Sequence, residues 1–201
     1  MKIVLATNNK DKVKEIKAFY KDLEIYALNE VMQSFEIEEN GKSFKENALI
    51  KSKEVYKKLV FMGLENEFVA LSDDSGISVP VLGNLPGIYS ARYAGIHGED
   101  AKNRQKLQNE INKIGLQKTD AFYTACISLS SKFGDFTTHG FMFGKIINKD
   151  LGQNGFGYDF MFIPNGFDKT VAELDLKTKL EISHRSNGLI LMRYIINALK
   201  I

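Results

Sequence analysis

The chain has few of the features that mark secreted, membrane or nucleic-acid-binding proteins. Its single cysteine, Cys126, excludes an internal disulfide, and its place in the apolar run 122–129 suggests a small buried hydrophobe. A net charge of +2 gives no argument for binding nucleic acid or a membrane surface. No stretch approaches the length that spans a bilayer, and the apolar run 3–6 is too short for a signal-peptide core. We therefore predict a cytoplasmic protein that binds neither nucleic acid nor membrane.

Repeats, low-complexity tracts and convincing linkers are also missing, so we predict a single domain over residues 1–201. Hydrophobic residues make up 44% and charged residues 26%, as in ordinary globular proteins. Apolar runs and helical spacings alternate along the chain, which predicts an α/β fold. The expected strands are 2–7, 68–71, 77–82, 122–129, 138–147 and 160–163. Four helices are expected. The first carries Val13, Ile16 and Tyr20, and the second begins near Ser43. The third carries Leu107, Ile111 and Ile114, and the fourth covers residues 189–199.

Residues 68–76, Phe-Val-Ala-Leu-Ser-Asp-Asp-Ser-Gly, place two adjacent carboxylates where an apolar strand should end. Ligands of open α/β sheets bind at that end of a strand, and Mg²⁺ is usually held by one or two carboxylates plus phosphates. The same residue types also favour a turn, so both interpretations stay open for this stretch alone. If the backbone is extended there, Asp73 and Asp74 point to opposite sides and should not share one role.

A second polar cluster, residues 7–12, lies between the first strand and the first helix. Backbone amides at a helix N-terminus, a hydroxyl and nearby ammonium groups can bind phosphate. The G-x-x-x-x-G-K-[ST] pattern of a P-loop is absent. A solvated polar turn is the alternative interpretation of this cluster.

Lys51 is unusual because it lies in the middle of an apolar helical stripe. Residues 43–46, Ser-Phe-Lys-Glu, match a capping box, and counting from Phe44 places residues 44, 48, 51 and 55 on one face. The ammonium either reaches water along the surface or borders a cleft and binds an anionic ligand. In the second case Lys51→Met should weaken binding of that ligand with little loss of stability.

Two later motifs could recognise a nucleobase. Residues 155–159, Gly-Phe-Gly-Tyr-Asp, combine glycines that allow close approach with two aromatic rings that could stack on a planar base. A loop whose aromatic rings belong to the core is the alternative. His184 and Arg185 carry hydrogen-bond donors suited to a phosphate or a purine edge. A surface feature or a contact at the start of the last helix is the alternative for this pair.

Six motifs in register resemble one family, the inosine/xanthosine triphosphate pyrophosphatases, over nearly the whole chain. They are Thr7-Asn8-Asn9 with Lys12, Ser43-Phe44 with Glu46-Asn47-Ala48 and Lys51, Ser72-Asp73-Asp74-Ser75-Gly76, Pro86-Gly87-Ile88-Tyr89-Ser90-Ala91-Arg92, Phe156-Gly157-Tyr158-Asp159, and Ser183-His184-Arg185. The resemblance implies a two-lobed α/β fold with a long mixed sheet flanked by helices and a cleft between the lobes. It also implies Mg²⁺-dependent hydrolysis of ITP, dITP or XTP to the monophosphate and pyrophosphate, usually by a homodimer.

Site residues follow from the resemblance position by position. Asp74 matches the catalytic carboxylate and a metal ligand, Glu39 matches the second metal-binding acid, and Asp73 matches a supporting carboxylate. Lys51 is grouped with the catalytic residues and with the triphosphate cradle. The remaining substrate-binding residues are Thr7, Asn8, Asn9, Lys10, Asp11, Lys12, Ser75, Phe156, Gly157, Tyr158, Asp159, Lys179, His184 and Arg185.

Two other functions remain possible at this point. A related pyrophosphatase could act on pyrimidine or modified nucleotides, although Phe156–Asp159 and the His184-Arg185 pair match purine recognition. A nucleotide-binding protein without turnover is the other possibility. The acids Glu39, Asp73 and Asp74 argue against it, because binding alone does not need this acid cluster.

Overall fold

The computed structural model describes residues 1–200, and their contacts divide into two compact units. Unit 1 comprises Met1–Asp74, Ala125–Gly140 and the residues from Arg185 onward. Unit 2 comprises Ser75–Thr124 and Phe141–His184. Each unit has its own buried apolar residues, so the two are described separately below.

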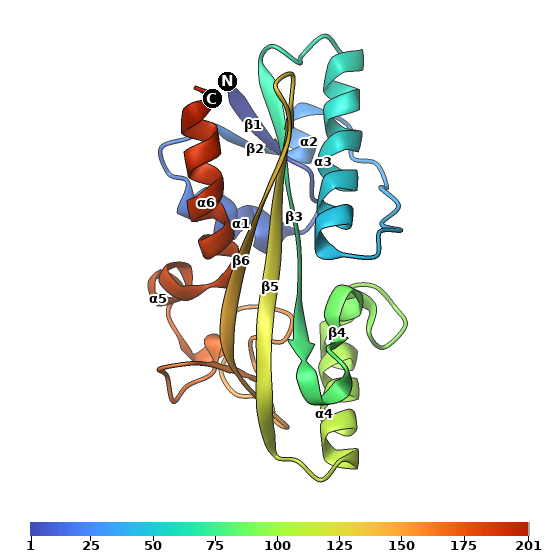
Figure 1. The fold of residues 1–201 in the computed structure, drawn as a ribbon, viewed down its shortest axis with the longest axis vertical. Helices are drawn as coiled ribbons and strands as arrows, with labels where there is room; N and C mark the ends of the chain where they lie inside the picture. Colours follow the sequence, from blue (N-terminus) through green and yellow to red (C-terminus); the bar gives the residue numbers. More distant parts are fainter. Residues whose placement is uncertain (201) are drawn as a thin grey trace. The chain divides into compact units, whose positions relative to one another are not determined.

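The strands form a mixed sheet, which confirms the predicted α/β class with helices flanking the sheet (Figure 1). The strand order is β2-β1-β3-β5-β6-β7, and β4 pairs with β3. β1 is parallel to both β2 and β3, whereas β4 and β7 are antiparallel to their partners. The strands are β1 (Lys2–Leu5), β2 (Ile25–Ala27), β3 (Phe68–Val79), β4 (Leu85–Pro86), β5 (Lys118–Ser131), β6 (Gly134–Ile147) and β7 (Phe162–Pro164).

All four predicted helices are present, and two short helices were not predicted. The α-helices are α1 (Lys10–Phe19), α2 (Leu28–Val31), α3 (Phe44–Phe61), α4 (Asp100–Lys113), α5 (Leu176–Ile182) and α6 (His184–Ala198). Three 3₁₀ helices cover Pro80–Leu82, Gly87–Arg92 and Val171–Glu173. The last helix begins earlier than expected, so His184 is its first residue.

In unit 1 both faces of the sheet are buried: α1 and α6 cover one face, and α3 covers the other (Figure 1). Odd-numbered strand residues face α1 and α6: this cluster includes Ile3, Leu5, Val69 and Leu71 with Ile16 and Met192. Even-numbered residues face α3: this cluster includes Val4, Ala6, Phe68 and Ala70 with Val55 and Leu59. The alternation follows from the two-residue period of an extended chain.

The prediction that the strand beginning at Phe68 ends where Asp73 and Asp74 follow is wrong, as is the turn interpretation of that stretch. β3 runs without interruption from Phe68 to Val79, through both aspartates and Gly76. Asp and Gly disfavour strands in general, but such preferences give way where side chains find partners on the sheet faces. The segment expected as a separate strand at 77–82 is the end of β3 followed by a 3₁₀ turn.

Unit 2 has its own core, in which α4 packs on strand residues. Leu107 and Ile111 of α4 are fully buried with Ile77 and Val79 of β3. Ile114, expected on the same helical face, lies beyond the end of α4 and is 45% exposed.

No helix within residues 1–200 is both long enough and apolar enough to cross a bilayer.

Candidate active site

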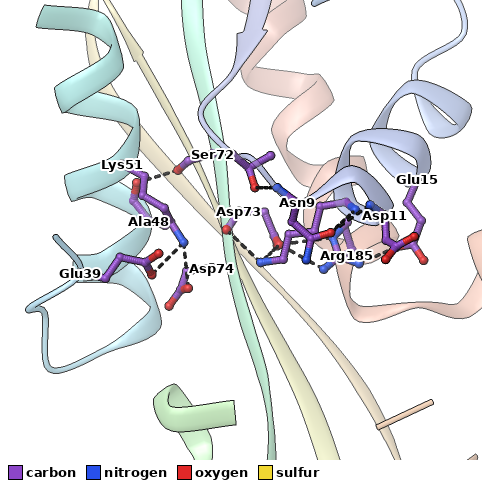
Figure 2. A network of polar contacts seen from close by, with 12 residues as sticks. Asn9, Asp11, Glu15, Glu39, Ala48, Lys51, Ser72, Asp73, Asp74 and Arg185 are labelled. Carbon is purple, nitrogen blue, oxygen red and sulfur yellow. Dashed lines mark hydrogen bonds and ion pairs between the residues drawn. The ribbon is translucent and has the colours of Figure 1, made fainter. Parts of the chain in front are cut away.

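β3 presents its polar residues to opposite sides of the sheet in unit 1. Ser72 and Asp74 point toward α3, where the Ser72 hydroxyl donates to the carbonyl oxygen of Ala48 at 2.6 Å. Asp73 points the other way, toward α1 and Arg185 (Figure 2). The prediction that the two aspartates face apart is confirmed, and each aspartate lies in a different charged cluster.

The first cluster consists of two carboxylates that share one ammonium. Lys51 Nζ lies 2.9 Å from Asp74 Oδ1 and 3.0 Å from Glu39 Oε2 (Figure 2). Lys51 is 7% exposed, which excludes the surface-reaching arrangement. Its ammonium instead binds two carboxylates of the chain itself.

The surroundings separate the pKa values of the two acids. Burial raises the pKa of the Asp74 carboxyl above its ordinary value, although Lys51 and Lys12 oppose this. Burial acts the same way on Glu39, but there the charge and hydrogen bond of Lys51 outweigh it and hold the pKa below its usual range. Burial alone would lower the pKa of Lys51, but Asp74 and Glu39 together raise it. Burial and the Lys51 ammonium therefore shift the pKa values of these two carboxyls in opposite directions.

The loop that carries Glu39 is fixed to the first turn of α3. Ser43 caps the helix by accepting from the Glu46 N–H at 3.1 Å, as predicted. The Glu46 carboxylate binds the N–H of Lys42, not that of Ser43, so only half of the expected capping box forms. The buried Asn47 accepts the N–H of Gly41 through Oδ1 at 2.8 Å. These bonds hold the chain two residues after Glu39.

Gly41→Ala should displace this loop and cut activity. A Cβ at Gly41 would lie 2.6 Å from Asn47 Oδ1 and 2.7 Å from Glu46 Cβ, closer than real contacts allow. We expect a loss of about 1–3 kcal/mol in the free energy of unfolding, measured by urea denaturation, together with reduced pyrophosphate release. Lys42→Ala is the control, because Lys42 is exposed and its contact with Glu46 is made by its backbone N–H. Wild-type stability and activity in Gly41→Ala would contradict this role of the loop.

The second cluster is a buried chain of alternating charges around Asp73. Lys12 Nζ lies 2.8 Å from Asp73 Oδ2, and Arg185 Nη2 lies 3.1 Å from the same oxygen. Arg185 also pairs with Glu15 of α1 (Figure 2). Burial alone would lower the pKa of Arg185, but Asp73 and Glu15 raise it; burial lowers the pKa of Lys12 despite Asp73.

Glu15 was not singled out from the sequence. Its signal was available, because it follows Lys12 by three residues on one helical face and precedes the buried Ile16. Arg185 was expected on the base-recognition side. Its guanidinium binds two carboxylates of unit 1, so it links α6 to α1 and β3.

The polar cluster at residues 7–12 was expected to lie between the first strand and the first helix, but α1 already begins at Lys10, so only residues 7–9 precede the helix. Asn9 is the N-cap, and its side chain accepts the N–H groups of Asp11 and Lys12. The Thr7 hydroxyl accepts the N–H of Asn9 at 3.1 Å. Asn8, Asn9, Lys10 and Asp11 are exposed.

Unit 2 holds the predicted base-recognition loop. Asp159 Oδ2 lies 2.7 Å from Lys179 Nζ and accepts the N–H of Phe156 at 3.1 Å. The Lys179 ammonium lies 4.8 Å from the centre of the Phe156 ring. Tyr158 is buried in the core and donates to the carbonyl of Ser90 at 2.9 Å, so the core alternative holds for this aromatic. Phe156 is half-buried and lies outside that core cluster.

His184 and Ser75 complete the predicted residues. The His184 ring stacks on Tyr123 with centroids 4.5 Å apart and planes inclined by 12°. This contact fixes the plane of the imidazole at the first residue of α6. Ser75 is half-buried and follows Asp74 directly on β3.

Comparisons with known proteins identify the family of the chain. The model of the Ham1 family matches residues 3–194. A dITP/XTP pyrophosphatase of Campylobacter fetus subsp. fetus (strain 82-40) is 66% identical, with 100% of this chain and 98% of that protein covered. One of Campylobacter jejuni subsp. jejuni serotype O:2 is 54% identical over 99% and 98% of the two chains.

Solved structures show the same fold. The Staphylococcus aureus Ham1 protein has a TM-score of 0.83 at 35% identity, covering 98% of this chain and 99% of that one. A HAM1 protein from Coxiella burnetii has a TM-score of 0.84 at 33% identity, with the same coverage. The family resemblance that the motifs indicated is confirmed, and this chain belongs to the Ham1 family.

Proposed function

We propose that this protein hydrolyses non-standard purine nucleoside triphosphates, such as dITP, ITP and XTP, to the monophosphate and pyrophosphate. The observation that carries the proposal is the buried cluster in which Asp74 and Glu39 share Lys51. It occurs in a chain that matches dITP/XTP pyrophosphatases over its full length. Phosphoryl transfer depends mainly on neutralising the negative charge of the phosphates. This cluster contains an ammonium group and two carboxylates that can bind a metal cation.

Asp74 and Glu39 are the residues that would hold Mg²⁺. Both approach one Nζ atom within 3.0 Å, so their oxygens converge, and carboxylate oxygens are the ligands this ion prefers. Among residues 1–200 there is no group of three or more His, Cys, Asp or Glu that could hold a metal. Two carboxylates, with phosphates and water filling the other positions, suit Mg²⁺ in nucleotide sites. The bound ion would neutralise charge on the phosphates.

The remaining residues of unit 1 support this role for Asp74. Its raised pKa suits a base that accepts a proton from the attacking water. Lys51 keeps Asp74 and Glu39 in place through its two ion pairs. Asp73 binds Lys12 and Arg185, so it acts by holding cations in place and not as a second base.

In unit 2, Phe156, Asp159, Lys179 and His184 are the residues proposed for the base. Hypoxanthine and xanthine differ from adenine at the 6-oxo group, which accepts a hydrogen bond. A donor such as His184 is satisfied by this group and left unpaired by a 6-amino group, whereas the Arg185 guanidinium is already taken by Asp73 and Glu15. An unpaired buried donor costs about 1–3 kcal/mol, which is about a tenfold to hundredfold preference.

Pyrophosphate release from a panel of nucleotides with Mg²⁺ tests the proposal. We expect rapid release from ITP, dITP and XTP and slow release from ATP, whose base has a 6-amino group, and from the pyrimidine nucleotide dUTP. Guanine also carries a 6-oxo group, so slow release from GTP would require rejection at its 2-amino group. Equal rates on ATP and ITP would contradict the specificity, and orthophosphate as the product would contradict the reaction. Removing Mg²⁺ with a chelator should stop turnover.

A homodimer and a cytoplasmic location also remain predictions. The molecular mass of the protein in solution tests the first of them.

A further inference from the structure

One face of α4 binds the segment that contains the proposed base-binding loop. Asp100, Arg104 and Gln108 are spaced four residues apart and lie on one side of the helix. Arg104 Nε lies 2.7 Å from Asp150 Oδ2, and the Gln108 amide donates to Asp150 Oδ1 at 2.8 Å. The Arg104 guanidinium also lies 4.4 Å from the centre of the Phe160 ring. These contacts hold both ends of the segment 150–160.

Between those ends, Asp100 and Arg104 bind both polar groups of Gly157. Asp100 Oδ2 accepts the Gly157 N–H at 2.8 Å, and Arg104 Nη1 donates to the Gly157 carbonyl at 2.9 Å. Gly157 has φ of +58°, a conformation that other residues rarely adopt. Without these two bonds, this glycine would have many conformations available, because glycine is the least restricted residue. The two side chains therefore fix the backbone where the loop is intrinsically loosest.

The fixed glycine lies directly beside the groups proposed to contact the base. Phe156 precedes it, and Asp159, two residues later, accepts the Phe156 N–H and binds Lys179. The residues just before the loop, 152–155, are exposed and include two glycines with positive φ. The orientation of the Phe156 ring thus depends on the bonds at Gly157 as well as on Asp159.

We propose that Asp100 and Arg104 are positioning residues for nucleotide binding, which hold Gly157 so that Phe156 and Asp159 meet the base. This inference rests on the proposed function and concerns the base alone, because neither side chain belongs to the acid and lysine cluster around Asp74. Its signature is therefore a weaker affinity for nucleotides without a change in the chemical step or in the affinity for phosphates.

Steady-state kinetics of Asp100→Ala and Arg104→Ala test this signature. We expect KM for ITP to rise about tenfold, as for one lost hydrogen bond to a fixed group, with kcat within about twofold of wild type. Inorganic tripolyphosphate, which has the phosphates without a base, serves as a competitor, and its inhibition constant should not change. Asp100→Asn keeps an oxygen that accepts the Gly157 N–H and should restore most of the affinity. Lys102→Ala, at a residue of α4 whose 65% exposed side chain pairs with Glu99, is the matched control.

The outcomes separate the two proposals. Absence of pyrophosphate release from ITP by the wild-type protein would refute the proposed function. Wild-type turnover with an unchanged KM in both alanine variants would refute only the role of Asp100 and Arg104. An equal rise in KM and in the inhibition constant of tripolyphosphate would also refute it, because the effect would then not concern the base. If an alanine variant fails to fold, Asp100→Asn and Arg104→Lys decide: Asp100→Asn should resemble wild type and Arg104→Lys should have a raised KM.

Discussion

Asp74→Asn should reduce pyrophosphate release by about a hundredfold to ten-thousandfold, the range expected when a positioned proton acceptor is removed. The amide has nearly the same shape as the carboxylate, but it cannot accept a proton from water and is a poor ligand for Mg²⁺. Lys51 keeps Glu39 as a partner at 3.0 Å, so no buried ammonium is left unpaired and the fold should persist. Rates with ITP and the thermal unfolding midpoint are the two measurements.

Asp120→Asn provides the matched control for that variant. Asp120 lies on β5, its side chain is 78% exposed, and it pairs with Lys145. A surface pair of this kind contributes little to stability, so this variant should behave like wild type in both measurements. More than about a tenth of wild-type activity in Asp74→Asn would remove Asp74 from the role of base.

Lys51→Met should destabilise the protein as well as inactivate it. The expectation from the sequence, a weaker triphosphate affinity with little loss of stability, assumed an ammonium facing a ligand. In the structure the ammonium separates two carboxylates, and its removal leaves Asp74 and Glu39 close together without a counter-charge. Breaking a buried pair in this way costs about 3 kcal/mol or more in the free energy of unfolding, as measured by urea denaturation at pH 7.

The same variant tests the proposed metal site through stability alone. If Asp74 and Glu39 hold Mg²⁺, the ion supplies the positive charge that Lys51 no longer provides. Millimolar Mg²⁺ should then raise the unfolding midpoint of Lys51→Met more than that of wild type. Lys53→Met, on the same helix with a 48% exposed side chain paired to Asp135, should show neither effect. An unchanged stability of Lys51→Met without Mg²⁺ would contradict the charge argument.

The sequence predicted α1 and α3 well, because their signals are local. Ser43 caps α3 as expected, and Asn9 caps α1 where the polar turn was predicted. Helix caps depend on residues within one turn, so neighbours in the chain suffice to locate them. The course of β3 could not be predicted in the same way. Asp73, Asp74 and Gly76 favour a turn locally, and only partners on other elements keep them in a strand.

Those partners are remote along the chain. Lys51 is 23 residues from Asp74, Arg185 is 112 from Asp73, and Glu15 is 170 from Arg185. Tyr158 likewise donates to Ser90, 68 residues away, which decides that this aromatic belongs to the core. No periodicity or spacing encodes such pairings, because they form only when helices and strands pack.

By itself the sequence determined the family, through six motifs in register. It also predicted that an extended chain alternates its two aspartates and that Lys51 lies on an apolar helical face. The tertiary structure decided what each of these residues binds. β3 continues through Asp73 and Asp74, so Asp74 meets Lys51 and Glu39 on the α3 side while Asp73 meets Lys12 and Arg185 on the other. The physical reason is that a buried charge requires a counter-charge, and the counter-charges come from elements far apart in the sequence.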